Sequence, residues 1–483
     1  MPAPADAPTP VEAPTLVDAL APVEAPTPAA LVDSSAPAAS VAPGAPMDAP
    51  TSATLVDAPT LAASPAPAGP VTPVHAPTPA TPAASLATGA PVDTPGRWIW
   101  GAAWPVTAVF VLSNAATPLY GLWQRDIGFS RGTLTVIFAC YIVGLLGSLL
   151  VSGVVSDRLG RKPVLLPALG LALAACAIFA TASSVAALMV ARLFTGIAVG
   201  AVVSAGMAAV TDVAGPARRR RAALLASCAM VFGAGLGPFL AGSLSETLPG
   251  PTVTVFAVEA ALLLTAVVAV VRMPVPRPVA PARGSWVRVP GVPRGNGSQL
   301  ALGIAVFAPG ITATSFVLSL GPSLLSGLLG TESRVVAGAM AFAMFLTATG
   351  VQFAVRALAR RTILIAGALS TALGMAVLIA AAHTSSAPAL VAAALLAGAG
   401  QGLGQLGGLS LLNSAVPPQR LAEANAALNI GGYALAGVLP VSAGYLSDAV
   451  GLTRGTTLFA AVLLALAVIG GLVVARGRTD GPR

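Results

Sequence analysis

The sequence predicts an all-α integral membrane protein whose transmembrane helices form two sets of six. Hydrophobic residues make up 56% of the 483 residues and charged residues only 9%, whereas a soluble domain usually carries about 25% charged residues. Twelve apolar runs follow Pro95, and each is long enough for a helix to cross a hydrocarbon core about 30 Å thick. Basic residues fall mainly in alternate loops between these runs, which is typical of multi-pass membrane proteins.

The N-terminal segment, residues 1–96, has the composition of a disordered tail. It holds 22 of the 43 prolines and repeats variants of a short Ala-Pro-Thr phrase. Such a chain buries too little apolar surface to offset the entropy lost on ordering. It has no basic stretch followed by an apolar core, so it does not resemble a signal peptide. We expect either a tether or interaction arm, or a dispensable extension upstream of a start near Arg97.

The apolar runs divide the rest of the chain into two halves joined by a basic linker. The first half, residues 97–271, contains the runs 98–122, 133–154, 163–182, 185–211, 222–244 and 252–271. The second half, residues 300–476, contains the runs 300–328, 335–355, 362–382, 387–413, 421–446 and 455–475. The linker, residues 272–299, has five arginines and no acid. We expect this linker and the short C-terminal tail, residues 477–483, to be cytoplasmic.

The basic residues also predict how the helices are oriented, because Lys and Arg are retained on the cytoplasmic side during insertion. With a cytoplasmic N-terminus, twenty of the 25 basic residues lie in inner loops or at inner helix ends. Only four, Arg125, Arg131, Arg334 and Arg454, lie outside, and Arg192 falls within a helix. The sequence therefore predicts a multi-pass protein of the plasma (inner) membrane with both termini in the cytoplasm.

The loop after the second apolar run carries the most specific motif, Gly153-Val-Val-Ser-Asp157-Arg158-Leu-Gly160-Arg161-Lys162. A glycine, an acid four residues later, and then arginine, glycine and two basic residues resemble the loop signature of the major facilitator superfamily. That family has two pseudo-symmetric six-helix bundles. The resemblance implies a conformational latch made by Gly153, Asp157, Arg158, Gly160, Arg161 and Lys162, with Asp212 at the end of the fourth run. Alternatively, the basic residues only fix topology, which leaves Asp157 unexplained.

Two charged residues lie inside apolar runs, where a charge costs at least a few kcal/mol and persists mainly for function. Arg192, in the fourth run, is followed by Gly196, Gly200 and Gly206. This resembles the second motif of the superfamily, whose arginine takes part in proton transfer; the alternative is a guanidinium that snorkels to the membrane surface. Glu259, in the sixth run, is predicted to gain and lose a proton during transport, because a buried carboxyl is sensitive to its surroundings.

The fifth apolar run contains a glycine-rich stretch, Gly233-Ala-Gly235-Leu-Gly237-Pro238-Phe-Leu-Ala241-Gly242. Glycines four residues apart line one helical face and allow close helix contact, and Pro238 removes a backbone donor and bends the helix. The stretch resembles the motif of drug and metabolite antiporters, with Ala241 in place of one glycine. Gly233, Gly237, Pro238 and Gly242 therefore favour export over uptake, with ordinary small-residue packing as the alternative.

Uncharged polar side chains mark a candidate substrate cavity. Asn114 lies in the first apolar run, and Gln401 and Gln405 lie in the tenth. Polar groups on apolar helices must face a cavity or a protein partner rather than lipid. The family resemblance implies that the first, fourth, seventh and tenth helices surround the path, so we expect these three residues to line it.

The sequence offers little for enzyme, metal or nucleotide chemistry. The three cysteines lie in apolar runs without a CxxC spacing, and the two histidines have no catalytic neighbours. Neither a clustered catalytic set nor a Gly-rich Lys-Ser/Thr nucleotide motif is present. We expect no catalytic residues, no metal, no cofactor and no nucleotide or nucleic-acid partner. The expected partners are the lipid bilayer, protons and a small-molecule substrate, and we expect a monomer.

These observations and the resemblance together imply a secondary active transporter that works by alternating access. We expect a proton-coupled efflux antiporter for small drug-like compounds or secondary metabolites, driven by the transmembrane proton gradient. The alternative among transporters is a proton-coupled importer or a sugar or metabolite carrier. From a different class, the chain could be a transport-like membrane sensor, which would lose its phenotype on removal of residues 1–96 but keep it when transport is abolished.

Overall fold

The structure is a computed structural model that describes residues 96–275, 286, 290–355, 357–417 and 420–477. All of these residues belong to one compact unit, Pro82–Arg483. Almost all of the predicted tails at 1–96 and 477–483, and much of the predicted linker at 272–299, lie outside the described residues.

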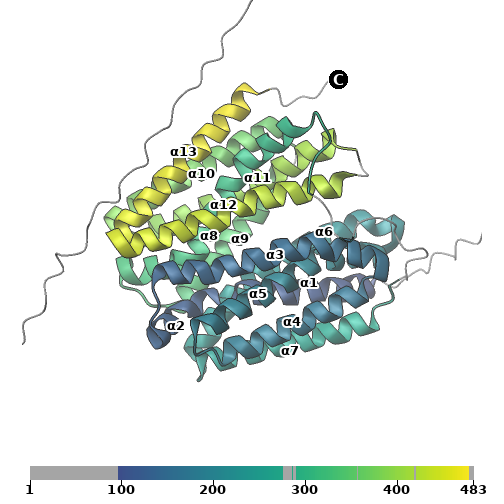
Figure 1. Ribbon diagram of the computed structural model, residues 1–483, viewed down its shortest axis with the longest axis horizontal. Helices are drawn as coiled ribbons and strands as arrows, with labels where there is room; N and C mark the ends of the chain where they lie inside the picture. The colour runs from purple at the N-terminus through teal and green to yellow at the C-terminus, as the bar shows by residue number, and fades with distance from the viewer. Residues whose placement is uncertain (1–95, 276–285, 287–289, 356, 418–419, 478–483) are drawn as a thin grey trace, which may run out of the picture. The chain divides into compact units, whose positions relative to one another are not determined.

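The first half is entirely helical within the described residues (Figure 1). Its elements are α1 (Arg97–Ala115), η1 (Thr117–Leu119), α2 (Tyr120–Ile127), α3 (Arg131–Leu159), α4 (Lys162–Ala180), α5 (Val185–Ala201), η2 (Val202–Gly206), α6 (Met207–Thr247) and α7 (Pro251–Arg272). The first span continues from α1 through the 3₁₀ turn η1 into α2. Helix α6 breaks at Gly215, whose φ of 70° lies in the left-handed region, and the break separates the fourth span from the fifth.

The second half repeats this plan with fewer interruptions. Its helices are α8 (Gly297–Leu329), α9 (Arg334–Ala354), α10 (Arg360–Thr384), α11 (Ala387–Ala415), α12 (Leu421–Val450) and α13 (Leu452–Arg476). Among the described residues, twelve helical stretches are long and apolar enough to cross a membrane. They correspond one to one with the twelve runs predicted from the sequence, so the prediction of an all-α membrane fold is confirmed.

Four serines begin equivalent helices in the two halves. Ser130 and Ser184 cap α3 and α5, and Ser333 and Ser386 cap α9 and α11. In each case the side-chain oxygen accepts a hydrogen bond from the backbone N–H three residues later, which satisfies a donor that the helix itself leaves free. The matching caps support the pseudo-symmetry of the halves.

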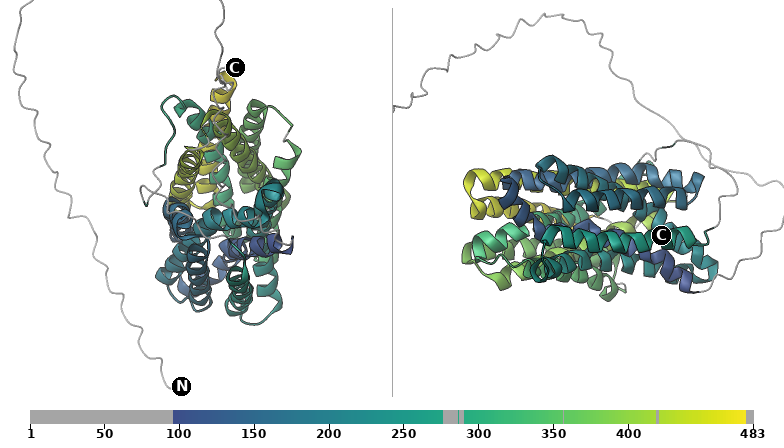
Figure 2. Two further views of the ribbon diagram at one scale, coloured as in Figure 1. Left: turned by 90° about the vertical axis from the view of Figure 1, so that its right-hand side faces the viewer. Right: turned by 90° about the horizontal axis from the view of Figure 1, so that it is seen from below.

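Two helix pairs make the largest contacts between the halves: α3 packs against α12, and α6 packs against α9. Figure 1 shows α3 beside α12, and Figure 2 shows the same helices from two other directions. Small residues make the α6–α9 contact close. A Cβ on Gly338 of α9 would clash with the carbonyl of Pro238, and a Cβ on Gly235 would lie 2.9 Å from the ring of Phe342. Close backbone approach through small residues is a common way to pack membrane helices.

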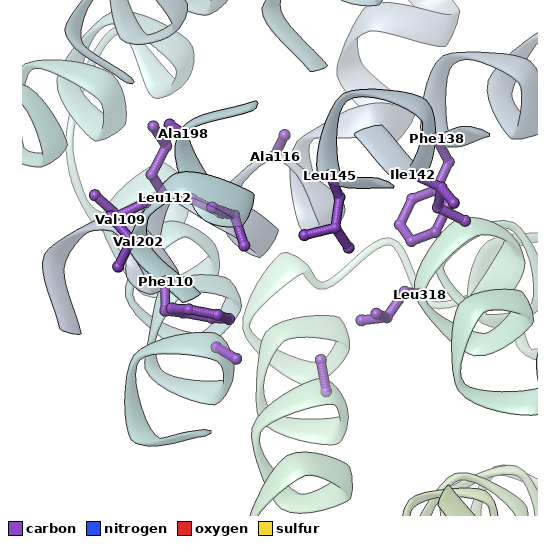
Figure 3. Close-up of a cluster of buried hydrophobic side chains, with 14 of the residues drawn as sticks. Val109, Phe110, Leu112, Ala116, Phe138, Ile142, Leu145, Ala198, Val202 and Leu318 are labelled. Carbon is purple, nitrogen blue, oxygen red and sulfur yellow. The ribbon is translucent and has the colours of Figure 1, made fainter. Parts of the chain in front are cut away.

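Apolar side chains from several helices form a continuous core. Figure 3 shows part of it, with Leu112 from α1, Phe138 and Ile142 from α3, and Leu318 from α8. Because Leu318 belongs to the second half, the core extends across the boundary between the halves.

The two ends of the helical bundle differ in how tightly they are packed. We call the end that carries Arg161 and the last turn of α7 the linker end, and the opposite end, where α3 and α9 begin, the far end. Residues 108–120, toward the far end of the first span, are all buried, and so are residues 306–321 of α8. Partly exposed positions interrupt the linker-end parts of both spans. The halves are therefore closed against each other at the far end.

Candidate functional site

Arg192 is a completely buried cation in the middle of the first half, with 0% of its surface exposed. Its Nε donates a hydrogen bond to the hydroxyl of Tyr120, and its Nη1 donates to the carbonyl of Ser113 at 2.7 Å. Its Nη2 has no hydrogen-bond partner. The ion pairs found among the described residues do not include Arg192. The side chain thus points into the bundle rather than snorkelling to a membrane surface.

Aromatic rings surround this guanidinium. Its Cζ lies 5.1 Å from the ring centre of Tyr120, 5.5 Å from that of Phe138, and 6.0 Å from those of Tyr141 and Phe179. Distances within about 6 Å allow cation–π attraction, which is stronger when the cation is desolvated. We call Tyr120, Phe138, Tyr141 and Phe179 the aromatic box. It stabilises the charge that lipid and the apolar core disfavour.

Glu259, the second buried charge, lies on α7 with 2% of its surface exposed. Its Oε2 has no hydrogen-bond partner. The rings of Trp123, Phe179 and Phe256 stack against one another, with ring centres 4.8 to 6.1 Å apart. Phe179 also faces Arg192, and Phe256 belongs to the same helix as Glu259, so the stack connects the surroundings of Arg192 to that helix.

At the linker end, the structure brings together two residues of the loop motif, Asp157 and Arg161, and Asp212 of α6. Arg161 donates a hydrogen bond to Asp157 at 2.7 Å and another to Asp212 at 2.8 Å. Partial burial of Arg161 lowers the pKa of its guanidinium, but its hydrogen bonds and charge interactions with Asp212 and Asp157 outweigh burial and raise the pKa above its ordinary value. This cluster connects the end of α3 to the start of α6, and its role as a conformational latch stays a prediction.

The other basic residues of the motif contact two different segments. The Nζ of Lys162 donates to the carbonyl of Val271 in the last turn of α7 at 2.7 Å, where a cation also complements the negative end of the helix. The guanidinium of Arg158 lies 4.2 Å from the ring centre of Trp286, in the segment between the halves. The chain reverses at Gly160, whose φ is 95°. The motif thus ties α3 to α7 and to the linker.

The glycine-rich stretch of α6 packs against both halves. A Cβ on Gly233 or Gly237 would meet the backbone carbonyls of Thr107 and Val111 in α1, and a Cβ on Gly242 would meet the carbonyl of Arg334 in α9. The carbonyl of Pro238 is itself the atom that Gly338 of α9 approaches. These positions therefore set the spacing of α6 to a neighbour in its own half and to one in the other half.

The three uncharged polar residues predicted to line the cavity have different surroundings. Asn114 is buried and donates through Nδ2 to the hydroxyl of Ser113 at 3.1 Å and to the carbonyl of Ala234 at 3.3 Å, so it joins α1 to α6. Gln401 has a buried Oε1 without a hydrogen-bond partner. Gln405, one turn further along α11, is partly buried.

The reasoning from sequence missed the residues that hold Arg192. Tyr120, Phe138 and Phe179 lie 72, 54 and 13 positions from Arg192 in the chain, and their sequence pattern is that of ordinary apolar residues. It also missed an acid near the far end of each half, Glu246 and Asp448, although a repeated phrase surrounds both. The described residues contain no group of three or more His, Cys, Asp or Glu side chains that could hold a metal.

Twelve apolar helices in two related halves, with Arg192 and Glu259 buried among them, define a multi-pass membrane protein. The family model described as Major Facilitator Superfamily matches residues 103–362. This match covers more than half of the chain, and the protein therefore belongs to the major facilitator superfamily.

Comparison with characterised sequences gives partial matches. The chain is 32% identical over 155 residues to the bovine (Bos taurus) major facilitator superfamily domain-containing protein 10, covering 28% of this chain and 33% of that protein. It is 36% identical over 108 residues to the 3-(3-hydroxy-phenyl)propionate transporter of Escherichia coli (strain K12), covering 22% of this chain and 26% of that protein. The chain thus spans a third or less of the length of the relatives it matches.

Solved structures match over most of both chains. The bacterial homologue of the human lysosomal transporter Spinster, in an inward-facing and occupied conformation, has a TM-score of 0.62 at 13% identity, covering 78% of this chain and 96% of that chain. The human organic anion transporter MFSD10 (TETRAN) has a TM-score of 0.54 at 20% identity, covering 78% and 99%. At these identities the likeness establishes the fold alone.

Proposed function

We propose that this protein is a proton-coupled secondary transporter that exports small organic anions with an apolar, aromatic body. The observation that carries the proposal is Arg192, a cation with 0% exposure, no ion-pair partner among the described residues and an Nη2 without a hydrogen bond. A buried charge of this kind is expensive and is retained mainly for function. A substrate carboxylate would supply the missing negative charge.

The chemistry of the aromatic box indicates what the rest of the substrate resembles. A planar guanidinium binds a carboxylate with two parallel hydrogen bonds, and the rings of Tyr120, Phe138, Tyr141 and Phe179 offer flat apolar surfaces around it. Polyanions and sugars would bring more polar groups than these surroundings can satisfy. Two similar proteins agree with this class by name, one an organic anion transporter and the other a transporter of an aromatic carboxylate.

Access to Arg192 requires a change of conformation. In the present state the far end is closed and the guanidinium is covered by Tyr120 and its neighbours. Substrate therefore reaches Arg192 only after Tyr120 moves or the halves rearrange, as alternating access requires. In this proposal Arg192 exchanges its bond to Tyr120 for one to the substrate, while Glu259 of α7 carries the proton.

The glycine-rich stretch of α6 supports export, and the charge distribution supports the orientation of the protein in the membrane. Gly233, Gly237 and Gly242 are needed for close helix contacts, and the stretch matches the antiporter motif, which favours export. The excess of basic residues at the linker end supports a cytoplasmic position for that end. We infer a plasma-membrane protein with cytoplasmic termini that acts as a monomer.

The proposal is tested with full-length protein in liposomes under an imposed proton gradient. The probes are 3-(3-hydroxyphenyl)propionate and its primary amide, which has the same shape but no charge. We expect transport of the acid and not of the amide. Arg192→Gln should weaken binding of the acid about 30-fold or more, the usual result of removing one partner of a buried charge pair, and Arg192→Lys should restore part of it.

Arg125→Gln is the matched control, because Arg125 is exposed and forms a surface ion pair with Glu332. It should transport like the parent protein. Equal transport of acid and amide, or an unchanged Arg192→Gln variant, would contradict an anion site at Arg192. Gradient-driven movement of the acid in the same direction as the protons would favour the importer over the antiporter.

A further inference from the structure

An acid from each half reaches across the boundary and binds the start of a helix in the other half. Glu246, at the end of α6, accepts hydrogen bonds from the backbone N–H groups of Arg334 and Val335, the latter at 3.2 Å. Asp448, near the end of α12, accepts from the N–H groups of Arg131 at 3.1 Å and Gly132 at 2.8 Å. Both contacts lie at the far end and span the two helix pairs that join the halves.

The two contacts are built alike. In each, the acid binds the first and second N–H groups of the helix, while a serine of the helix itself, Ser333 or Ser130, binds the third. A glycine four residues before each acid lets the helices meet. A Cβ on Gly242 would clash with the carbonyl of Arg334, and one on Gly444 would lie 2.9 Å from the carbonyl of Arg131.

The sequence repeats the same arrangement. Pro238-x-x-Ala241-Gly242-x-Leu244-Ser245-Glu246 in α6 matches Pro440-x-x-Ala443-Gly444-x-Leu446-Ser447-Asp448 in α12. The receiving helices match as well, since both begin with the dipeptide Ser-Arg, at Ser130 and Ser333. The acid, the glycine and the serine cap recur in both halves, so the two contacts are related by the pseudo-symmetry of the fold.

We propose that Glu246 and Asp448 form a pair of matched latches that hold the far end closed, and that the far end opens only when both acids leave the helix starts. A carboxylate at a helix N-terminus is favoured by the free N–H groups and by the helix dipole. When the halves separate, water molecules replace the carboxylates as hydrogen-bond acceptors for the first and second N–H groups of each helix. Ser130 and Ser333 stay in place, so α3 and α9 remain capped in both states.

Neighbouring side chains reinforce one latch and add a weaker contact between the halves. The guanidinium of Arg334 donates to the carbonyl of Ser245 at 2.8 Å, next to Glu246. Arg125 and Glu332 also pair across the halves at 3.1 Å, with 53% and 68% of their side-chain surfaces exposed. Exposed pairs contribute little, so the two helix-capping acids should dominate closure.

The test measures the far-end distance between the halves without any substrate, so its outcome is independent of the proposed function. Nitroxide labels are placed by Asp126→Cys in α2 and Arg454→Cys in α13, both exposed residues at the far end of opposite halves. Cys140, Cys176 and Cys228 are first replaced by alanine. Pulsed electron paramagnetic resonance then gives the distance distribution for the full-length chain in lipid nanodiscs.

Glu246→Gln and Asp448→Asn keep the shape of each acid and remove its charge. Each should raise the ratio of open to closed far ends about three- to tenfold, as expected for one carboxylate at a helix N-terminus, and the double variant should raise it about 10- to 100-fold. Glu423→Gln is the control, because Glu423 pairs with Arg420 of the same half, and it should leave the distribution unchanged.

Unchanged distributions in the double variant would overturn the proposal. If the double variant does not fold, the single variants decide. A shift in both supports paired latches, a shift in neither overturns them, and a shift in only one leaves that residue as an ordinary contact and refutes the pairing.

Discussion

Phe179 stacks on Phe256 with ring centres 4.8 Å apart and an angle of 16° between the rings; the contact joins α4 to α7, and its two rings belong to the surroundings of Arg192 and to the helix of Glu259. A cation and a carboxylate inside one bundle would ordinarily be expected to pair. Arg192 and Glu259 are instead not partners of each other, so in our proposal a substrate anion and a proton occupy separate positions.

Separate positions predict that proton coupling can be removed without removing transport. In Glu259→Gln the side chain keeps its shape but cannot release a proton, so exchange of labelled for unlabelled substrate should continue at near the parent rate. Accumulation driven by a pH gradient should fall to the level without a gradient. Liposomes assayed in both modes provide the measurement, with Glu423→Gln as control. Parent-like accumulation in Glu259→Gln would exclude Glu259 as the proton carrier.

The same carboxyl should limit stability. Glu259 has 2% exposure and an Oε2 without a partner, and burying an unsatisfied polar group typically costs about 1–3 kcal/mol. Glu259→Leu should therefore raise the Tm of the purified protein by about 2–4 °C while abolishing gradient-driven accumulation. Differential scanning fluorimetry in detergent measures the first effect. A lower Tm would show that the carboxyl has a stabilising partner.

The cluster at the linker end should stabilise the protein equally across the working pH range. Because interactions with Asp212 and Asp157 raise the pKa of Arg161 above its ordinary value, its contribution is fully present below the unfolded pKa. It is lost only as pH rises through the still higher folded pKa. Arg161→Gln should lower Tm by the same amount at pH 6 and pH 9. If the Tm difference between the parent protein and Arg161→Gln is smaller at pH 9 than at pH 6, another group must titrate between these pH values.

Glycine substitutions should separate packing positions from lipid-facing ones. Gly237→Ala places a methyl group against the carbonyl of Val111, so α6 and α1 must move apart, and overpacking of this kind typically costs about 1–3 kcal/mol. We expect a lower Tm and little transport. Gly170→Ala, where a Cβ would meet nothing within 4 Å, should be neutral or slightly stabilising. Equal effects of the two substitutions would contradict the close α1–α6 contact.

The sequence predicts the helical spans well because crossing a membrane requires a local property, a run of about 20 apolar residues. Asp157, Arg161 and Asp212 could be predicted to lie together because the loop signature of the superfamily implies that they form one cluster. The surroundings of Arg192 could not be predicted, since Tyr120, Phe138 and Phe179 meet only after three helices pack. Glu246 and Asp448 could have been found, because the repeated proline-to-acid phrase is visible in the sequence and the two helices that they contact both begin with Ser-Arg.

The π-helical turn η2 changes the rotation, about the helix axis, of the residues after it relative to the residues before it. The N–H of Met207 bonds to the carbonyl of Val202, five residues back, so this turn holds one residue more than an α-helix would. Arg192 lies before the turn and Asp212 after it. Removing one residue from η2 would convert it to an α-helical turn and swing everything beyond it by about 100°. The extra residue therefore sets the direction of the side chains that follow it. With this rotation, Arg192 faces the aromatic box and Asp212 faces Arg161.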